Sequence, residues 1–290
     1  MSYQLYISNS LEQLSHLLSD NLGKESPGVF QQQHIITQTE GMNKWLTGQI
    51  AIQQGITAQI AFHTPNDIIG LLHEWLSEKA SPVITAEKIR WQLWKELNQP
   101  EFQQTFPAIA QYYLEHPVRQ IALAVELADL FDQYQIYRYS TINDWNDTTA
   151  AADFQQYLWK KLHVYYKDRI LDKPGIVKKL KKALANKDQL QLLRNRVKGL
   201  HFFGIAVITP LHLELFKTLA AHIPLHFYLM NPAPLYYWMD DETEKAQIKR
   251  KQKNKFNMPS GDFNRPGNTL LLGWGTVIKD SFALLFQQEN

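Results

Sequence analysis

Three polar residues, Gln38, Glu40 and Lys44, follow a short β-branched run at residues 35–37 and accompany the start of an apolar helical pattern. In an open α/β sheet, ligands bind at the carboxyl ends of the strands, so these side chains are the first candidates for functional groups. The alternative is a turn with a helix N-cap, which strand-to-helix connections commonly contain. On spacing alone, the turn is the better interpretation.

Two carboxylates, Asp129 and Asp132, stand three residues apart near the end of the longest predicted helix. This spacing puts them on one helix face, where a carboxylate pair can carry acid–base chemistry. A solvated face or a salt bridge to a basic neighbour is several times commoner, so we do not interpret the pair as catalytic. Arg138 follows, and a salt bridge with Asp132 explains it as well as a contact with a ligand does.

The sequence contains no signature of nucleotide hydrolysis, hydrolase or metal chemistry. Loops of the types GxxxxGK[ST] and GxGxxG are absent, and the first predicted strand leads into Ser8, Asn9 and Ser10, without the glycines and lysine that hold phosphate. The strand around Phe203 lacks the acid that would hold Mg²⁺. The patterns HExxH, GxSxG and acidic-x-Lys are absent too. We therefore expect no catalytic, cofactor-binding or metal-binding residues in this chain.

The elements that must position these residues form an α/β pattern interrupted by helices. Strand and helix patterns alternate up to residue 63 and return at residue 199, while residues 64–198 show only helical patterns. We predict an α/β domain with a parallel sheet, residues 1–63 and 199–290, and an inserted all-helical domain, residues 64–198. Thr64 is the predicted N-cap of the first inserted helix. The helix at 117–137 has a predicted buried stripe of Val118, Ile121, Ala122, Val125, Ala128 and Phe131.

Composition excludes several classes of protein. Without cysteine, disulfides and thiolate metal sites are impossible, which fits a reducing compartment. The net charge is +2, so any nucleic-acid contact must come from local patches. No apolar run approaches the ~20 residues of a membrane span, and no signal-peptide pattern opens the chain, so we expect no membrane contact and a cytoplasmic location. The basic run at 245–255 is predicted to be a solvated segment whose lysines could touch phosphates.

Short motifs occur along nearly the whole chain. In order they are Gln38-x-x-Gly41-Met42-x-x-Trp45-Leu46, Gly55-Ile56, Phe62-x-x-Pro65, Leu130-Phe131-Asp132-Gln133-Tyr134 with Tyr137-Arg138, Phe203-Gly204-Ile205 with Pro210-Leu211, Asn231-Pro232 with Tyr236-Tyr237-Trp238, and Asn268-x-Leu270-Leu271. Their order and spacing resemble the opening of the RecC family, the gamma subunit of exodeoxyribonuclease V. Members of that family are much longer, so we expect this chain to correspond to an N-terminal third.

The resemblance implies an inactivated superfamily 1 helicase-like motor whose accessory subdomain is the helical insertion. In the family this region hydrolyses no ATP; ATP and Mg²⁺ act in the partner subunits. It joins the helicase-nuclease (beta) and second helicase (alpha) subunits, splits the duplex, and guides and reads the 3′-ended strand during recombinational DNA repair. The implied partners are single-stranded and forked DNA and those two subunits.

The resemblance also implies which residues contact DNA. Carried over position by position, the strand-reading positions that match are Gln38, Asp129, Leu130, Asp132 and Arg138. Those that differ from the expected residues are Glu40, Lys44, Thr64 and Gly70. We expect these departures to alter or abolish the recognition of a regulatory sequence. Trp45 lies on the apolar helix face and is assigned to the core. Two alternatives remain open: a protein-interaction module without DNA contact, and an active ATP-driven helicase domain.

Overall fold

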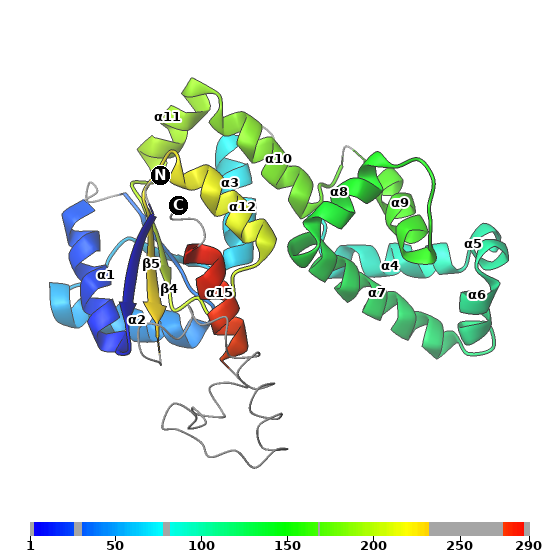
Figure 1. Cartoon of the computed structure of the whole chain (residues 1–290), viewed down its shortest axis with the longest axis horizontal. Coiled ribbons are helices and arrows are strands. Elements are labelled where there is room, and N and C mark those ends of the chain that lie inside the picture. Colours follow the sequence, from blue (N-terminus) through cyan, green and yellow to red (C-terminus); the bar gives the residue numbers. More distant parts are fainter. Residues whose placement is uncertain (1–2, 26–30, 78–81, 168, 232–274, 287–290) are drawn as a thin grey trace, which may run out of the picture. The chain divides into compact units, whose positions relative to one another are not determined.

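The computed structural model describes residues 3–25, 31–77, 82–167, 169–231 and 275–286 (Figure 1). The chain divides into two compact units. The first, which we call the sheet unit, comprises Met1–Thr64, Val197–Ile208 and Leu219–Asn290. The second, the helical unit, comprises Pro65–Arg196 and Thr209–Thr218, so residues 209–218 cluster with the helices although they follow a strand of the sheet.

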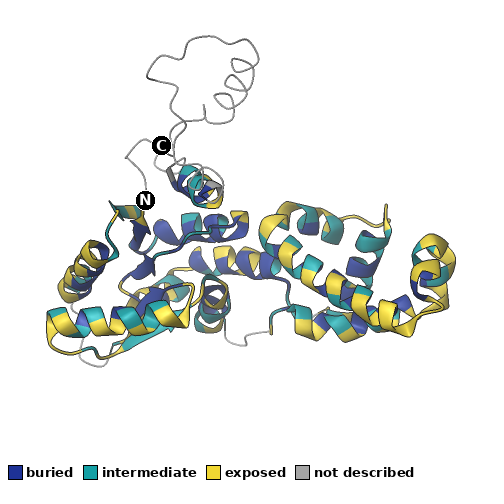
Figure 2. Ribbon diagram, turned by 90° about the horizontal axis from the view of Figure 1, so that it is seen from below, coloured by how far each residue is buried: buried dark blue, intermediate teal, exposed yellow. Residues whose placement is uncertain are grey.

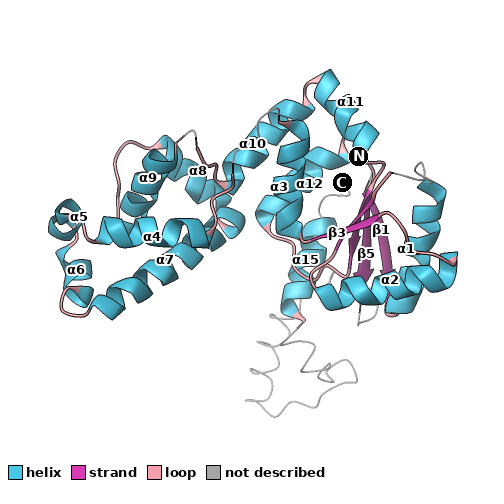
Figure 3. Ribbon diagram, turned by 180° about the vertical axis from the view of Figure 1, so that it is seen from behind, coloured by secondary structure: helices cyan, strands magenta, loops and turns pink. Residues whose placement is uncertain are grey.

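The sheet unit contains a five-stranded sheet (Figure 3). In spatial order its strands are β1 (Tyr3–Ser8), β5 (Leu225–Met230), β4 (Leu200–Phe203), β2 (Gln33–Ile36) and β3 (Ile60–His63). All four neighbouring pairs are parallel. The predicted α/β class with a parallel sheet is therefore confirmed, and strands from both ends of the sequence share the one sheet.

Two helices, α1 (Leu11–Glu25) and α2 (Glu40–Gln54), cover one face of this sheet. Alternate strand residues point to opposite faces, and Ile35, Phe203 and Tyr228 point to this one. They pack against Leu14, Leu18, Leu22, Leu46 and Ile50. Burying each of these side chains stabilises the fold by roughly 1.5–3 kcal/mol. Figure 2 shows the buried sides of the helices in dark blue and their outer sides in yellow.

Local sequence signals fix the ends of α2 and the turn after β4. Thr39 is the N-cap of α2, and Gly55 ends the helix with a φ of 79°. Gly204 follows β4 with a φ of 64°, a left-handed conformation that glycine adopts without a Cβ clash. The chain can therefore turn sharply where β4 leaves the sheet.

The sheet unit has one more described helix, α15 (Thr276–Phe286). Its Ser281 hydroxyl accepts a hydrogen bond from the Ile208 backbone N–H at 3.1 Å, and Phe282 and Leu285 are buried. The basic run at 245–255 and the motifs at 236–238 and 268–271 lie outside the described residues.

The helical unit is built from short helices, several of which begin at a proline, a residue that suits the first helical turn. They are α3 (Pro65–Leu76), α4 (Ala86–Leu97), α5 (Pro100–Thr105), α6 (Pro107–Tyr113), α7 (Pro117–Tyr137), α8 (Tyr139–Asp147), α9 (Phe154–Tyr166), α10 (Lys173–Leu184), α11 (Lys187–Arg196) and most of α12 (Pro210–Ala220). No helix in the described ranges has the length and apolar character needed to cross a bilayer.

The predicted buried stripe on α7 is wrong in most of its members. Val118 and Ile121 are 78% and 46% exposed. The buried face instead consists of Gln120, Ala124, Leu127, Ala128, Phe131 and Gln135. Helix α4 packs against α7, and small alanine side chains on the buried face allow close approach. The helical period was correct, but apolar residues occur on two adjacent faces of α7, and only tertiary packing selects between them.

Candidate nucleic-acid interface

The loop between β2 and α2 is held by its own side chains. The Thr39 hydroxyl accepts a hydrogen bond from the Met42 backbone N–H at 3.2 Å, and the Thr37 hydroxyl donates to the side-chain carbonyl of Asn43. The first of these bonds satisfies one of the unpaired N–H groups at the start of a helix. The turn interpretation of this loop is therefore confirmed, and the loop is a fixed platform for the residues that it exposes.

Gln38, Glu40 and Lys44 all project from this platform into solvent. Glu40 lies in the first turn of α2, where a carboxylate interacts favourably with the helix dipole. Lys44 is one turn further on and shares a helix face with Glu40. A DNA strand at this edge would meet the Gln38 amide as a hydrogen-bonding group and Lys44 as a cation, while Glu40 would repel its phosphates.

Thr64 belongs to the same edge of the sheet. Strands β2 and β3 pair in parallel up to Ile36 and His63, and the Thr37 N–H then donates to the His63 carbonyl at 2.9 Å. Gln38 and Thr64 therefore follow neighbouring strand ends, and both side chains are exposed. Four of the predicted contact residues, Gln38, Glu40, Lys44 and Thr64, thus lie at one edge of the sheet unit.

The carboxylate of Asp132 forms an ion pair within the helical unit. Its carboxylate oxygens lie 3.0 and 3.1 Å from the ammonium group of Lys173, a residue that is 7% exposed. The Lys173 backbone N–H also donates to the side-chain carbonyl of Gln135 at 2.9 Å. These bonds fasten the end of α7 to the first turn of α10. Asp132 is therefore held in a structural ion pair, with Lys173 rather than with Arg138.

Asp129 and Arg138 differ from Asp132 because both are exposed. Arg138 lies between α7 and α8, and its guanidinium group stacks over the ring of Tyr134, 5.2 Å from the ring centroid. A guanidinium held in this way is oriented before it meets a ligand and keeps donors free for a phosphate or a base edge. In the helical unit, Arg138 is thus the predicted contact residue best placed to bind DNA.

Sequence reasoning missed a recurrence of this cation–aromatic arrangement in the helical unit. Arg119 stacks over Tyr112 at 5.6 Å, Lys161 over Tyr157 at 5.1 Å and Arg169 over Tyr165 at 4.9 Å. Only Tyr157 and Lys161 lie four residues apart within one helix, so helical spacing could have indicated that pair and not the other two. Rings beside cations can stack bases while the cation meets phosphate.

The carboxyl end of β1, where a motor ATPase would have its phosphate loop, is closed by side chains. The Ser10 hydroxyl accepts from the Gln13 N–H at 3.3 Å, and the Ser8 hydroxyl accepts from the Ser10 N–H at 3.1 Å. The Ser8 hydroxyl also donates to the Gln13 side chain at 2.7 Å. These backbone donors are therefore already bonded, whereas a phosphate loop leaves such donors open.

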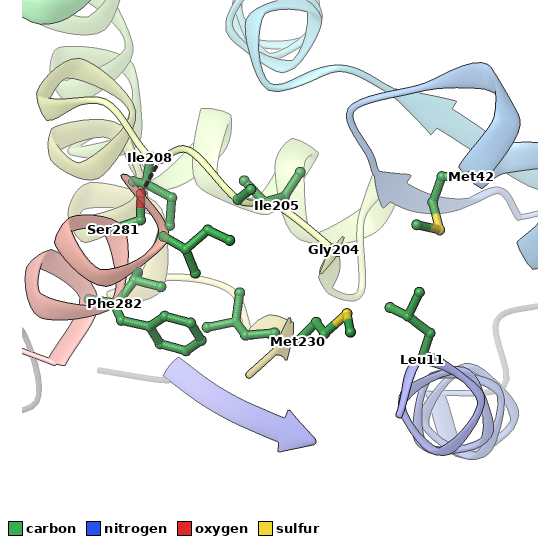
Figure 4. A pocket seen from close by; sticks show the side chains of 12 residues that line it. Leu11, Met42, Gly204, Ile205, Ile208, Met230, Ser281 and Phe282 are labelled. Atoms are coloured by element: carbon green, nitrogen blue, oxygen red, sulfur yellow. Dashed lines mark hydrogen bonds between the residues drawn. The ribbon is translucent and has the colours of Figure 1, made fainter. Parts of the chain in front are cut away.

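Beside it, at the ends of β4 and β5, lies a pocket of about 350 Å³ (Figure 4). Its lining is apolar except for one serine and consists of Leu11, Met42, Gly204, Ile205, Ala206, Ile208, Leu229, Met230, Ile278, Ser281, Phe282 and Leu285. No lining residue carries a charge that could hold a triphosphate or Mg²⁺. The pocket therefore lies at the edge where open α/β sheets bind ligands, but its lining is apolar.

The amino ends of β4 and β5 hold a buried polar network. The two carboxylate oxygens of Glu25 each lie 3.1 Å from an imidazole Nε2, one of His201 and one of His226. Tyr228 lies 3.2 Å from the other nitrogen of His201 and accepts from Asn21 at 2.9 Å. Burial alone would raise the pKa of Glu25, but the two histidine hydrogen bonds lower it to about 2. Burial lowers the pKa of His201, so we assign His201 as a neutral donor to the carboxylate.

A second pair of histidines joins the two strands that carry the loop platform. His34 Nδ1 lies 3.0 Å from His63 Nε2. Burial, with a smaller effect of the neighbouring His63, lowers the pKa of His34 to about 4. One imidazole can donate to the other only while at least one of them is neutral, and the lowered pKa of His34 keeps one ring neutral in mildly acidic solution as well. The described residues contain no group of three or more His, Asp or Glu residues able to hold a metal ion.

Comparison with known proteins relates the whole chain to one family. The family model described as RecC, N-terminal domain, matches residues 3–290. The RecBCD enzyme subunit RecC of Haemophilus influenzae is 23% identical over 350 residues, covering 99% of this chain and 30% of that protein. The subunit of the same name from Escherichia coli is 26% identical over 326 residues, covering 99% and 28%. That from Mycolicibacterium smegmatis is 24% identical over 245 residues, covering 82% and 22%. The chain thus spans less than a third of the length of these relatives.

Proposed function

The chain belongs to the RecC family, and from this premise we propose that it is a non-catalytic, DNA-binding scaffold region of an ATP-dependent helicase-nuclease. The relatives are named as subunits of the RecBCD enzyme. In our proposal the complex processes double-strand DNA ends for recombinational repair. The chain guides and scans the 3′-ended single strand, while the beta and alpha subunits bind ATP and Mg²⁺.

The observation that carries the proposal is the chemistry of the carboxyl edge of the sheet. A helicase motor would hold its nucleotide at this edge. Here the pocket at β4 and β5 is apolar, and the donors after β1 are bonded to side chains. Both features support a sheet that has kept the architecture of a motor without its ATPase function.

The exposed polar groups support DNA contact by two parts of the chain. Gln38, Lys44 and Thr64 form the contact edge of the sheet unit, and Arg138 provides an oriented guanidinium in the helical unit. Asp132 supports the second part indirectly, because its ion pair with Lys173 holds the end of α7. The relatives are bacterial, and bacterial chromosomes lie in the cytoplasm, so we propose that compartment for this protein.

The test is fluorescence anisotropy of the full chain with a forked DNA that carries a 3′ single-stranded tail, at about 50 mM salt. The double variant Gln38→Ala/Arg138→Ala should bind the fork about five- to 150-fold more weakly, since each lost polar contact costs about 0.5–1.5 kcal/mol and two cost about 1–3 kcal/mol. The control variant Gln104→Ala/Lys95→Ala removes an exposed glutamine and an exposed cation elsewhere and should bind as the unmodified chain does.

Two results would replace the proposal with another function. DNA-stimulated ATP hydrolysis by the purified chain would identify an active motor. Undetectable fork binding, both by the chain alone and by a complex reconstituted with the beta and alpha subunits, would identify a protein-interaction module.

A further inference from the structure

The two consecutive helices α10 and α11 are the most basic part of the helical unit (Figure 1). Residues 173–196 contain eight lysines or arginines and one aspartate, whereas the whole chain has 30 basic and 28 acidic residues. The rest of the chain is therefore net negative. A near-neutral total charge thus conceals one strongly positive segment.

The lysines of α10 occupy the side of the helix opposite to its core. Ile176, Val177, Leu180 and Leu184 are buried, while Lys178, Lys179, Lys181 and Lys182 are exposed. On α11, Lys187 and Arg194 are seven residues apart and share a face, and both are exposed. Both helices pack against α3. We call Lys178, Lys179, Lys182, Lys187 and Arg194 the basic face.

Few carboxylates of the described residues neutralise this charge. Lys181 is paired with Glu214 of α12. Within the described ranges, no carboxylate lies within 4.0 Å of the ammonium groups of Lys178, Lys179, Lys182 and Lys187. The charge of Lys179 affects a neighbouring group. Burial is the main cause of the lowered pKa of His73, and the positive charge of Lys179 is the next.

Helix stability alone does not explain the lysine spacing. Lys178 and Lys182 are four residues apart, and Lys179 and Lys182 are three apart, so their like charges repel one another across one turn, by about 0.2–0.5 kcal/mol per pair. The helix dipole compensates only for lysines in the last turn, Lys181 and Lys182. A bound polyanion would relieve the remaining repulsion.

We propose that the basic face binds the sugar-phosphate backbone of duplex DNA without reading its sequence. Lys178 to Lys182 extend over about 6 Å of helix axis, and duplex DNA carries one negative charge per about 1.7 Å of its length. Residues 173–196 contain no aromatic residue. Single-strand sites combine cations with aromatic platforms for the bases, so a basic surface without rings suits the phosphates of a duplex.

The choice of DNA among polyanions rests on the proposed function, whereas the charge and geometry of the face do not. The variant that tests it is Lys178→Gln/Lys179→Gln/Lys182→Gln/Lys187→Gln in the full chain. The matched control, Lys24→Gln/Lys88→Gln/Lys95→Gln/Lys167→Gln, removes the same charge from exposed lysines outside α10 and α11. Circular dichroism and thermal unfolding establish that both variants are folded.

The measurement is the affinity for a blunt 25-base-pair duplex and for an oligo(dT) strand of equal length, between about 50 and 200 mM salt. The basic-face variant should bind the duplex about ten- to a hundredfold more weakly at the lowest salt. The slope of log affinity against log salt should fall in magnitude by about 3–4, near 0.9 for each lost phosphate contact. Oligo(dT) binding should change less than threefold, and the control variant should keep the unmodified duplex affinity and slope.

Four outcomes would overturn the inference. The control variant could lose as much duplex affinity as the basic-face variant, or the unmodified chain could fail to bind the duplex at the lowest salt. The basic-face variant could lose affinity for oligo(dT) alone, or lose binding to poly-glutamate while its duplex binding is unchanged. The last would assign the face to an acidic protein partner. If any of these four outcomes occurs while fork binding still depends on Gln38 and Arg138, the proposed function stands and only the inference about the basic face fails.

Discussion

The sheet unit and the helical unit place their polar chemistry in opposite ways. In the sheet unit, histidines form buried polar contacts: Glu25 with His201 and His226, and His34 with His63. In the helical unit the cations lie on the surface, over tyrosine rings or on the basic face. The sheet unit is therefore built as a scaffold that exposes one polar edge, and the helical unit as a charged surface. Asp132 is the exception in the helical unit, because it pairs with the buried ammonium group of Lys173.

Removing the Asp132 carboxylate should have the largest effect on stability. The variant Asp132→Ala leaves the Lys173 ammonium group, which is 7% exposed, without its partner. We expect a loss of about 2–3 kcal/mol in the free energy of unfolding, below the full value for a wholly buried pair because Asp132 is half-buried. Urea unfolding followed by tryptophan fluorescence measures it. Asp129→Ala, an exposed neighbour on the same helix, should change stability by less than about 0.5 kcal/mol; equal losses would show that Asp132 is not structural.

Acid should weaken the sheet unit at the contact between His34 and His63. The pKa of His34 is lowered to about 4 in the folded chain. As pH falls below about 6.5, His34 is therefore protonated in the unfolded chain while it stays neutral in the folded chain. The contribution of His34 to the free energy of unfolding is complete above pH ~6.5 and falls towards pH ~4. The expected loss is about 2 kcal/mol, a figure reduced to allow for partial exposure of His34 to water. Hydrogen exchange of peptides from β2 and β3 should show this loss. The variant His34→Gln should flatten the pH dependence, and an unchanged slope would remove His34 as its origin.

The Glu25 network should be sensitive to loss of one acceptor oxygen. In Glu25→Gln the amide NH₂ group faces an imidazole donor, so one buried hydrogen bond is lost, at a cost of about 1–2 kcal/mol. Because the pKa of Glu25 is lowered to about 2, its stabilisation is present above pH ~4.5 and disappears as pH falls towards 2. Unfolding at pH 7 and pH 3 should therefore show a smaller difference between variant and parent at pH 3. Glu12→Gln on the exposed side of α1 provides the control.

The smallest expected effect is at the exposed edge of the sheet unit. Lys44→Ala should leave stability unchanged within about 0.5 kcal/mol, because the side chain is exposed. In the fork-binding assay it should lower affinity about twofold to threefold and reduce the salt slope by about 0.7, the value for one phosphate contact of a single strand. A large loss of stability instead would mean that this edge is structural, and the contrast between the two units would disappear.

Local features of this fold could be predicted from the sequence, and long-range pairings could not. Gly55 and the Thr39 turn follow from residue types that favour one backbone conformation. The partner of Asp132 is 41 residues away, and that of Glu25 is 176 residues away, so no spacing rule points to either. The loop residues at the carboxyl edge could be chosen because parallel strands expose their ends together. The basic face of α10 and α11 could not be predicted from the net charge of +2, because a total charge does not say how the lysines are distributed among the helices.

The order of strands in the sheet also governs when the fold can form during synthesis. Strand β1 pairs with β5 and with no other described strand, and β4 separates β5 from β2. The first strand made must therefore wait for residues 225–230, after nearly all of the helical unit has left the ribosome. Closing so long a loop costs little more than closing a short one, about 0.6 kcal/mol for each doubling of length. A chain ending before residue 225 would keep most of its helices but leave β1 as an unpaired edge, open to association with other chains.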